Sequence, residues 1–285
     1  MTAASRLRAL MKQGTVVAPG VYDGLSAKLA QLAGFDVIYA TGGGIARSSG
    51  LPDLGILDAG VVVNRLEQIV DASGLPVIAD LDTGFGNALN ARQVARAFER
   101  AGVAGFHVED QTFPKRCGHY EDKSVVPTAE FVQKIRAIKD VLHDADTLVI
   151  ARTDAIAIEG LDSALERAHA YAQAGADVIF VEAPTSVEQI ETIGRELPYP
   201  KLMNMFKSGK TPMVPVARLT ELGYAIVIIP SDLQRAAMKA MVKVLEAIKR
   251  DGNSMAVDAD LASFAEREAS VGTARFLEIE KRFAA

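Results

Sequence analysis

The stretch Pro76-Val77-Ile78-Ala79-Asp80-Leu81-Asp82-Thr83-Gly84-Phe85-Gly86 decides the fold of this chain. Its first four residues form a short apolar run, which is typical of a parallel strand that is covered on both faces. The rest is a polar, glycine-rich turn that carries two acids, Asp80 and Asp82. The pattern predicts a buried strand with polar side chains at its carboxyl end.

The same pattern recurs along the chain, and an amphipathic helical stretch follows most of the apolar runs. Eight strands are predicted, at 15–19, 36–41, 76–82, 105–110, 147–153, 177–182, 201–206 and 225–230. Helices are predicted between them at 26–32, 92–100, 130–141, 161–174 and 233–249. Thr185 and Glu188 have capping-box spacing, which predicts the start of another helix.

Four glycines mark predicted helix ends, namely Gly34, Gly102, Gly175 and Gly223. Glycine is favoured just after a helix because it adopts a left-handed backbone without steric cost. A strand is predicted within one or two residues of each glycine. These positions precede the second, fourth, sixth and eighth strands and so support the strand count.

Eight strand–helix units predict one TIM (β/α)8 barrel of the α/β class, whose typical size is about 250 residues. A doubly wound open sheet is the alternative, but the glycine fingerprint that opens such sheets is missing. No Pro/Gly/Ser-rich linker divides the chain. Residues 1–252 are therefore predicted to form the barrel with a short N-terminal helix, and residues 253–285 a helical extension.

Composition narrows the class of protein. The formal net charge is −5 and 49% of the residues are hydrophobic, as in an ordinary globular protein. The absence of a basic stripe, tryptophan and zinc-finger spacing argues against nucleic-acid binding. No apolar run is long enough for a membrane span, and the N-terminus is typical of an amphipathic helix rather than a signal peptide. We expect a cytoplasmic enzyme.

Polar side chains cluster at the ends of the predicted strands, where a barrel carries its chemistry. They are Asp53, Asp80, Asp82, His107, Glu109, Arg152, Asp154, Glu182 and Asn204. Strand alternation predicts that Asp80 and Asp82 face the same way, as do His107 and Glu109. Clustered carboxylates stay ionised only beside a cation, and oxygen ligands favour Mg²⁺ or Mn²⁺. The alternative is that each acid caps a helix.

Two further features point to a small-acid site. Residues 42–44 are three glycines without a P-loop lysine, so we interpret them as backbone N–H donors to a carboxylate or oxyanion. Cys117 is the only cysteine and lies between Arg116 and His119. Positive neighbours stabilise a thiolate, which favours a reactive thiol over a buried small hydrophobic residue.

These motifs together resemble the isocitrate lyase/phosphoenolpyruvate mutase superfamily. The matching segments lie in order at 39–44, 50–55, 80–86, 107–111, 115–119, 151–155 and 182–183. Segment 115–119, Lys-Arg-Cys-Gly-His, is highly specific and is similar to that of carbon–carbon lyases of the 2-methylisocitrate and dimethylmalate type. A carboxyphosphoenolpyruvate phosphonomutase segment shares it.

The resemblance implies that Asp80 binds Mg²⁺ directly, or Mn²⁺ in its place, and that Asp53, Asp82 and Glu109 hold its waters. The implied ligands of the α-keto acid half are Tyr39, Thr41, Gly42, Gly43, His107 and Arg152. The implied groups around the second product and the reacting bond are Lys115, Arg116, Cys117, His119, Glu182 and Asn204.

The implied activity is retro-Claisen cleavage of a 2-hydroxy di- or tricarboxylate to an α-keto acid such as pyruvate and a second carboxylate. Cys117 would protonate the second product as it leaves. The resemblance also implies a homotetramer that exchanges a C-terminal helix. Phosphonomutase chemistry and a non-catalytic paralogue that binds a small acid stay open as alternatives.

Lys207 departs from the lyase pattern, which usually has glutamate at this position. A lysine in the pocket would favour a substrate with an additional anionic group. A lysine that faces solvent would have no effect on the substrate.

Overall fold

The computed structural model describes residues 1–116, 123–205, 207 and 209–284. Within them, eight parallel strands close into a barrel in sequence order, with β8 pairing back to β1. The strands are β1 Val16–Val21, β2 Ile38–Ala40, β3 Val77–Asp80, β4 Gly105–Glu109, β5 Leu148–Thr153, β6 Val178–Val181, β7 Lys201–Asn204 and β8 Tyr224–Ile229. The predicted (β/α)8 barrel is confirmed.

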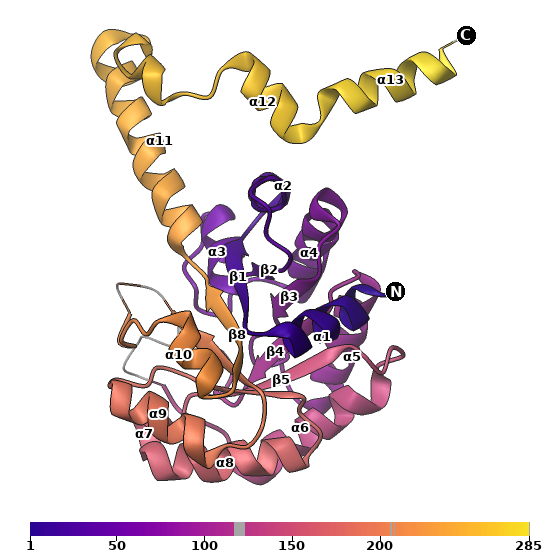
Figure 1. Cartoon of the computed structure of the whole chain (residues 1–285), viewed down its shortest axis with the longest axis vertical. Coiled ribbons are helices and arrows are strands. Elements are labelled where there is room, and N and C mark those ends of the chain that lie inside the picture. Colours follow the sequence, from indigo (N-terminus) through magenta and orange to yellow (C-terminus); the bar gives the residue numbers. More distant parts are fainter. Residues whose placement is uncertain (117–122, 206, 208, 285) are drawn as a thin grey trace.

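Helices surround the barrel, and the last ones extend away from it (Figure 1). The barrel helices are α1 Ala3–Gln13, α2 Gly24–Leu32, α3 Gly42–Ser48, α4 Ala59–Ser73, α5 Ala88–Arg100, α6 Thr128–Val141, α7 Ile156–Glu159, α8 Leu161–Gln173, α9 Val187–Glu196 and α10 Val216–Glu221. The C-terminal elements are α11 Asp232–Asp251, the 3₁₀ helix η1 Met255–Asp260, α12 Phe264–Val271 and α13 Thr273–Phe283.

The boundaries differ from the predicted ones where local backbone geometry intervenes. β3 ends at Asp80 because Asp82 has a left-handed backbone, with φ of 49°, which cannot continue a strand. Asp82 therefore lies outside the strand, so strand alternation does not set its direction, although both acids belong to the cluster around Lys115. Helix α9 starts one residue later than the capping-box spacing predicts, because Ser186 caps it and accepts the N–H of Gln189.

The four glycines that were predicted to end helices all have a positive φ, between 76° and 108°. Gly34, Gly102, Gly175 and Gly223 therefore occupy left-handed positions, where a side chain would be strained. Each glycine turns the chain from a helix into the next strand within a few residues. These turns stack the strand–helix units around the barrel.

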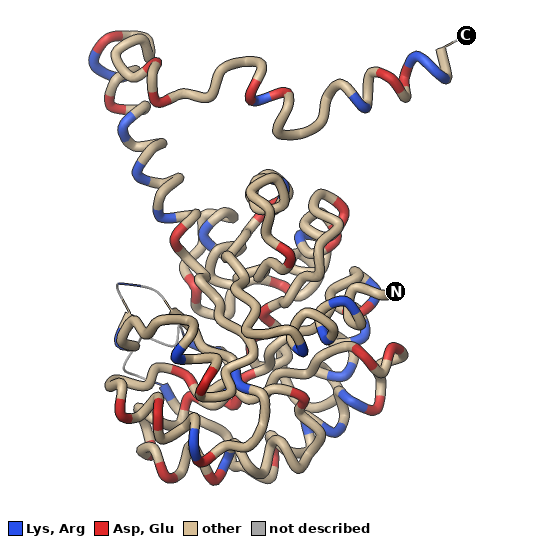
Figure 2. Tube along the Cα trace, viewed as in Figure 1, with Lys and Arg blue, Asp and Glu red and all other residues tan. Residues whose placement is uncertain are grey.

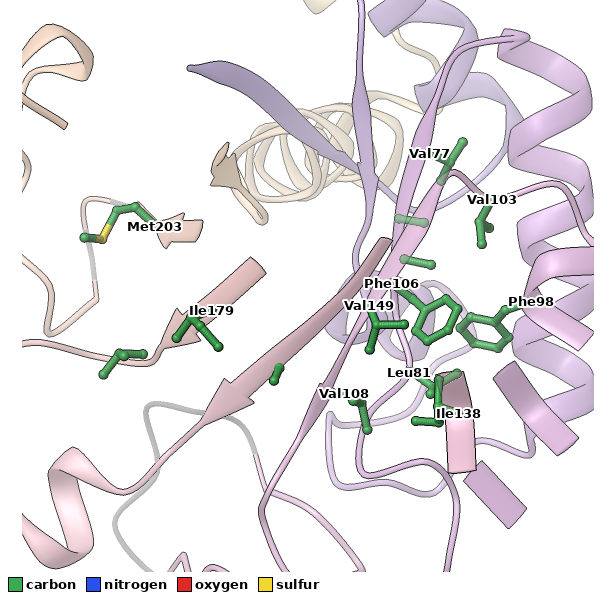
Figure 3. Close-up of a cluster of buried hydrophobic side chains, with 14 of the residues drawn as sticks. Val77, Leu81, Phe98, Val103, Phe106, Val108, Ile138, Val149, Ile179 and Met203 are labelled. Atoms are coloured by element: carbon green, nitrogen blue, oxygen red, sulfur yellow. The ribbon is translucent and has the colours of Figure 1, made fainter. Parts of the chain in front are cut away.

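Apolar side chains fill two separate layers. The larger layer lies between the strands and the outer helices, where Phe98 and Phe106 meet edge to face with centroids 6.0 Å apart (Figure 3). The smaller one contains alternate strand residues such as Ile150 and Ile226, and Leu7 of α1 packs against it. Packing on both sides of the strands explains why they read as continuous apolar runs.

The side chains that point into the barrel interior, here called the inner row, change from apolar to polar towards the carboxyl end of the strand. In β5, Leu148 and Ile150 belong to the apolar inner layer, and Arg152 follows them at the same alternation. The carboxyl end of the barrel thus receives buried polar side chains, whereas the rest of the inner row is apolar. This end holds the candidate site.

The C-terminal arm, defined here as residues 232–284, leaves the barrel along α11, and α12 then passes over α2 (Figure 1). Several apolar side chains of α11 are more than half exposed, with Met241 at 56% and Leu245 at 63%. Figure 2 shows both signs of charge interspersed over the barrel and the arm. In the described part of the chain, no helix has the length and apolar character needed to cross a membrane.

Candidate active site

A cavity of about 330 Å³ opens at the carboxyl ends of the strands. Its lining is Tyr39, Thr41, Gly43, Arg47, Asp53, Asp80, Lys115, Arg152, Glu182, Asn204, Pro230, Ser231, Gln234, Arg235 and Met238. A larger hollow of about 570 Å³ lies at the amino end, around Gly14 and Lys201, and contains none of the predicted site residues. The polar cavity is therefore the candidate active site.

Lys115 lies at the centre of the acid cluster. Its Nζ is 2.6 Å from Asp53 Oδ1 and 2.8 Å from Asp82 Oδ1, and the residue is only 4% exposed. Burial alone would lower the pKa of Lys115, but the carboxylates of Asp82, Asp80 and Asp53 outweigh it and raise that pKa well above its ordinary value. Lys115 therefore stays charged, and its ammonium group balances part of the negative charge of the clustered acids.

Asp80 is joined to Tyr39 and His107 in a buried trio. Tyr39 Oη lies 2.8 Å from His107 Nε2 and donates to Asp80 Oδ2 at 3.4 Å. Burial lowers the pKa of His107 to about 4, so the ring is neutral at neutral pH. Burial opposes ionisation of Asp80, but the charge that His107 carries at acid pH, together with Lys115 and Arg152, outweighs it and lowers the pKa of Asp80 to about 2. Asp80 is therefore a fixed anion.

Asp82 has the opposite tendency, although it also contacts Lys115. Its burial, together with the negative charges of Asp80 and Asp53, outweighs the ammonium group and raises its pKa to about 7. Two acids two residues apart are thus held in different states by their surroundings. Such a divergence of pKa is typical of functional sites.

A third group of charges surrounds Arg152 at the end of β5. Its Nε and Nη2 donate to the two carboxylate oxygens of Asp154, at 2.9 and 3.1 Å. Its Nη1 lies 3.2 Å from Glu109 Oε2 without hydrogen-bond alignment. Lys123 Nζ bonds Asp154 Oδ1 at 2.8 Å. Asp154 therefore fixes the guanidinium. The sequence placed Asp154 at the end of the strand, two residues after Arg152, but this role was not predicted from it.

Glu109 is a buried acid whose two carboxylate oxygens make no hydrogen bond to any residue that the structure describes. It is 1% exposed, and burial raises its pKa well above the ordinary value despite the charge of Arg152. An ionised carboxylate in such a place is costly unless a further cation or donor approaches it. Glu109 therefore leaves acceptor capacity beside Arg152, which lines the cavity.

The remaining walls combine backbone donors with an acid–amide pair. Thr41 caps α3, and its Oγ1 accepts the N–H of Gly44 at 3.4 Å. A Cβ on Gly42 would lie 2.7 Å from Asp80 Oδ2, so only glycine lets the chain approach the acid here. Residues 42–44, at the start of α3, form what is here called the glycine loop. Across the cavity, Asn204 Nδ2 lies 3.4 Å from Glu182 Oε1. The loop and the pair face the acid cluster from different strands.

Some predicted residues are not brought to the cavity. Arg116 has an exposed side chain, and Gln111 holds its backbone through two 2.9 Å hydrogen bonds. Lys207 is also exposed and does not line the cavity. Cys117 and His119 lie outside the described residues.

One wall of the cavity consists of residues that were not predicted from the sequence. Arg47 comes from α3, and Ser231, Gln234, Arg235 and Met238 come from the start of α11. Gln234 Nε2 donates to the carbonyl of Gly44 at 2.8 Å and so ties the arm to the glycine loop. No motif marks these positions, because they are ordinary helix residues that packing brings to the site.

Within the described ranges, no three His, Cys, Asp or Glu side chains are arranged to coordinate one ion. Mg²⁺ does not require such a set, since it often binds one or two carboxylates and keeps several waters. Fixed anionic Asp80 and the unbonded oxygens of Glu109 suit that mode. The donor set therefore fits a hydrated hard cation.

Comparisons with known proteins agree with this geometry. A family described as phosphoenolpyruvate phosphomutase matches residues 7–249. The chain is 42% identical to 2,3-dimethylmalate lyase of Eubacterium barkeri, over 100% of this chain and 99% of that protein. It is 41% identical to 2-methylisocitrate lyase of Halalkalibacterium halodurans, over 99% and 93%.

Solved structures show the same architecture. A 2,3-dimethylmalate lyase crystal structure superposes with a TM-score of 0.93 at 37% identity, covering 99% of this chain and 95% of that one. Phosphonopyruvate hydrolase in complex with oxalate and Mg²⁺ gives a TM-score of 0.90 at 34% identity, covering 99% of both chains.

Proposed function

The chain belongs to the phosphoenolpyruvate mutase/isocitrate lyase superfamily and is a carbon–carbon lyase of it, and we propose that it cleaves a 2-hydroxy dicarboxylate of the substituted malate type. The observation that carries this proposal is the buried acid cluster of Asp53, Asp80 and Asp82 beside the glycine loop and Arg152. The acid cluster suits a hydrated cation, and the glycine loop with Arg152 suits a carboxylate. A 2-hydroxy acid can bind to both, because its hydroxyl can approach the cation while its carboxylate binds the loop and Arg152.

The substituted malate class is supported by the size of the cavity and by the position of Lys207. A cavity of about 330 Å³ accommodates a small branched acid. Lys207 faces solvent and offers no cation for a third carboxylate. The 2,3-dimethylmalate lyase relative also aligns along the whole chain. A tricarboxylate of the 2-methylisocitrate type is the competing substrate.

We propose that the cofactor is Mg²⁺, held by Asp80 directly and by Asp53, Asp82 and Glu109 through waters. Bound there, the ion would supply a Lewis acid that lowers the pKa of the substrate hydroxyl. Asp80→Ala should abolish turnover and leave the fold intact, because a strand-end acid of this kind does not support the core. Full activity after EDTA treatment would refute the metal proposal.

The side chains divide the remaining work between the two halves of the substrate. Thr41, Gly42, Gly43 and Arg152 would bind the carboxylate of the α-keto acid half, while neutral His107 and Tyr39 would orient its oxygens. Glu182 and Asn204 would hold the second half, and Lys115 would balance the charge of the acids.

The substrate hydroxyl gives its proton to a base, and its oxygen becomes the carbonyl oxygen of the α-keto acid. The bond between the hydroxyl-bearing carbon and its neighbour breaks, and its electron pair passes to the second half as an enediolate. A proton must then reach the carbon that loses the bond. We propose Cys117 as its donor, with Arg116 and His119 on the same segment. A thiol suits general acid catalysis near neutral pH because its ordinary pKa is about 8.5.

The decisive experiment measures pyruvate release from 2,3-dimethylmalate, 2-methylmalate and 2-methylisocitrate with Mg²⁺. We expect the highest kcat/KM for a substituted malate. A higher kcat/KM for 2-methylisocitrate would refute the proposed dicarboxylate substrate and show that the enzyme prefers a tricarboxylate. Absence of pyruvate, with phosphonate formation from a carboxyphosphoenolpyruvate substrate in ³¹P NMR, would favour phosphonomutase chemistry. Binding of small acids without any product would indicate a non-catalytic paralogue.

We further propose a cytoplasmic homotetramer that exchanges its C-terminal helices, with the extension starting after residue 252. An apolar groove of about 440 Å³ between β1, β8 and α2 supports the exchange, since it is lined by residues such as Val17, Leu29 and Phe35. The exposed apolar side chains of α11 provide a matching surface.

A further inference from the structure

Four cationic side chains line the catalytic cavity, and three of them already have partners. Lys115 contacts Asp53 and Asp82, while Arg152 is held by Asp154 and Glu109. Arg235 forms an ion pair with Asp232 at 3.1 Å. The fourth is Arg47.

Arg47 differs from these cations because no residue that the structure describes is its partner. Throughout the part of the chain that the structure describes, its guanidinium makes no hydrogen bond and no ion pair. The side chain is exposed at the cavity rim, on the α3 wall. An arginine head that borders a cavity and has all its donors available can bind an incoming anion.

The position of Arg47 identifies which part of a ligand it can reach. Its Nη1 lies 2.9 Å from the point that a Cβ on Gly43 would occupy, and Asp53 Oδ2 lies 2.9 Å from the same point. The guanidinium therefore lies directly over the glycine loop, next to the acid cluster. It is placed four residues after Gly43, so both lie on the same side of α3.

We propose that Arg47 is a substrate-binding residue that adds a guanidinium to the glycine loop and contacts the carboxylate of the 2-hydroxy acid half. The assignment rests on the proposed function, because that function places a carboxylate at Thr41, Gly42 and Gly43. A planar guanidinium can engage a carboxylate through two parallel N–H donors, which an ammonium group cannot do. Gly43 allows this approach because a side chain there would displace the arginine.

The proposed function already places Arg152 at this carboxylate, and the remaining cations near the barrel mouth are less suited to it. Arg235 approaches from α11 and has its ion pair with Asp232. Arg116 and Lys207 are exposed and do not line the cavity. Lys207 thus provides a matched control, since it is also a cation at the carboxyl end of the barrel.

The test measures binding of oxalate and of pyruvate, which carry only the keto-acid half, by calorimetry in the presence of Mg²⁺. Arg47→Met should raise the oxalate Kd about five- to twentyfold, and Arg47→Lys should recover only part of the loss. Lys207→Met should leave the Kd within about twofold. Added salt should weaken oxalate binding more in the wild type than in Arg47→Met, because it screens the additional charge.

Turnover provides the second readout. With the preferred 2-hydroxy acid, Arg47→Met should raise KM by a similar factor and change kcat little, as expected for a contact made equally in the ground and transition states. Thermal unfolding of each variant establishes that it is folded.

An unchanged oxalate Kd in folded Arg47→Met, or an equal loss in Lys207→Met, would overturn the assignment. If the wild type cleaves no 2-hydroxy acid but oxalate binding still depends on Arg47, the proposed function fails and the binding role stands. If cleavage occurs and oxalate binding is independent of Arg47, only the assignment fails.

Discussion

Lys115 shows how a single residue sets the charge balance of the site. Its ammonium group lies between Asp53 and Asp82, which are both largely buried. A buried carboxylate that loses its cation keeps its desolvation cost and also repels its neighbours. The state of the acid cluster should therefore depend on this side chain.

Lys115→Met should lower the free energy of unfolding by about 1–3 kcal/mol in EDTA, because two carboxylates lose their cation. Mg²⁺ should then stabilise the variant more than it stabilises the wild type, since the ion binds acids whose charge is no longer balanced. Urea unfolding with and without Mg²⁺ measures both effects. Lys115→Arg, which keeps the charge, is the control. An equal Mg²⁺ increment in Lys115→Met and the wild type would contradict this account.

The proposed role of Cys117 as proton donor rests on the sequence, and a substitution tests it. Cys117→Ser should lose about 10²- to 10⁴-fold in kcat, because a hydroxyl is a much weaker acid than a thiol and general acid catalysis is worth about that factor. Oxalate should still bind with nearly normal affinity. Steady-state kinetics and calorimetry on the same preparation separate the two effects, and a variant with near wild-type rate would exclude Cys117 as the essential donor.

At the scale of elements, the buried lysine at the start of β7 joins a strand to the preceding helix. Lys201 Nζ donates to the carbonyls of Leu197 and Tyr199, at 2.8 and 3.1 Å, just after the end of α9. A cation is favourable at a helix C-terminus. Burial nevertheless lowers the pKa of Lys201 to about 8.

Because of this lowered pKa, the free energy of unfolding should depend on pH in the alkaline range. Between about pH 8 and pH 10.5, the unfolded chain binds more protons at Lys201 than the folded chain does, so this residue makes stability rise with pH. The cost of holding the charged form is fully present below pH 8. The difference in unfolding free energy between the wild type and Lys201→Met should therefore shift in favour of the wild type from pH 8 to pH 10. A constant difference across that range would contradict the prediction.

For the whole molecule, the C-terminal arm raises the question of assembly. Met241 and Leu245 expose apolar surface on α11, and the groove at Val17 and Phe35 exposes more on the barrel. Apolar surface of this extent marks an interaction site. The proposed homotetramer covers both surfaces with copies of the same chain.

Light scattering at micromolar concentration should give the mass of a tetramer. Met241→Glu with Leu245→Glu should shift the mass towards monomer and lower the thermal midpoint by several degrees, because charges then occupy an apolar contact. Lys239→Glu, on the polar side of α11, is the control and should leave the mass unchanged. A monomeric wild type would refute the assembly.

The sequence by itself determined the order of the fold and the location of the candidate active site. The apolar runs fixed eight strands, since a parallel strand covered on both faces must be apolar along its length. Gly34 and Gly223 marked helix ends because a left-handed position tolerates few other residues. Asp80 and Glu109 could be predicted as site residues because each lies at the end of a predicted strand. These are local features, which neighbouring residues in the chain specify.

Only the tertiary structure decided the contacts within the site. The left-handed backbone at Asp82 turns this acid out of the strand, and its raised pKa depends on burial and on Asp80 and Asp53. Lys115 meets an acid from a loop 62 residues away. Arg47 reaches the cavity from a helix that carries no motif. Such contacts join distant segments, so their distances and charges depend on how the closed barrel packs, which no local pattern of residues encodes.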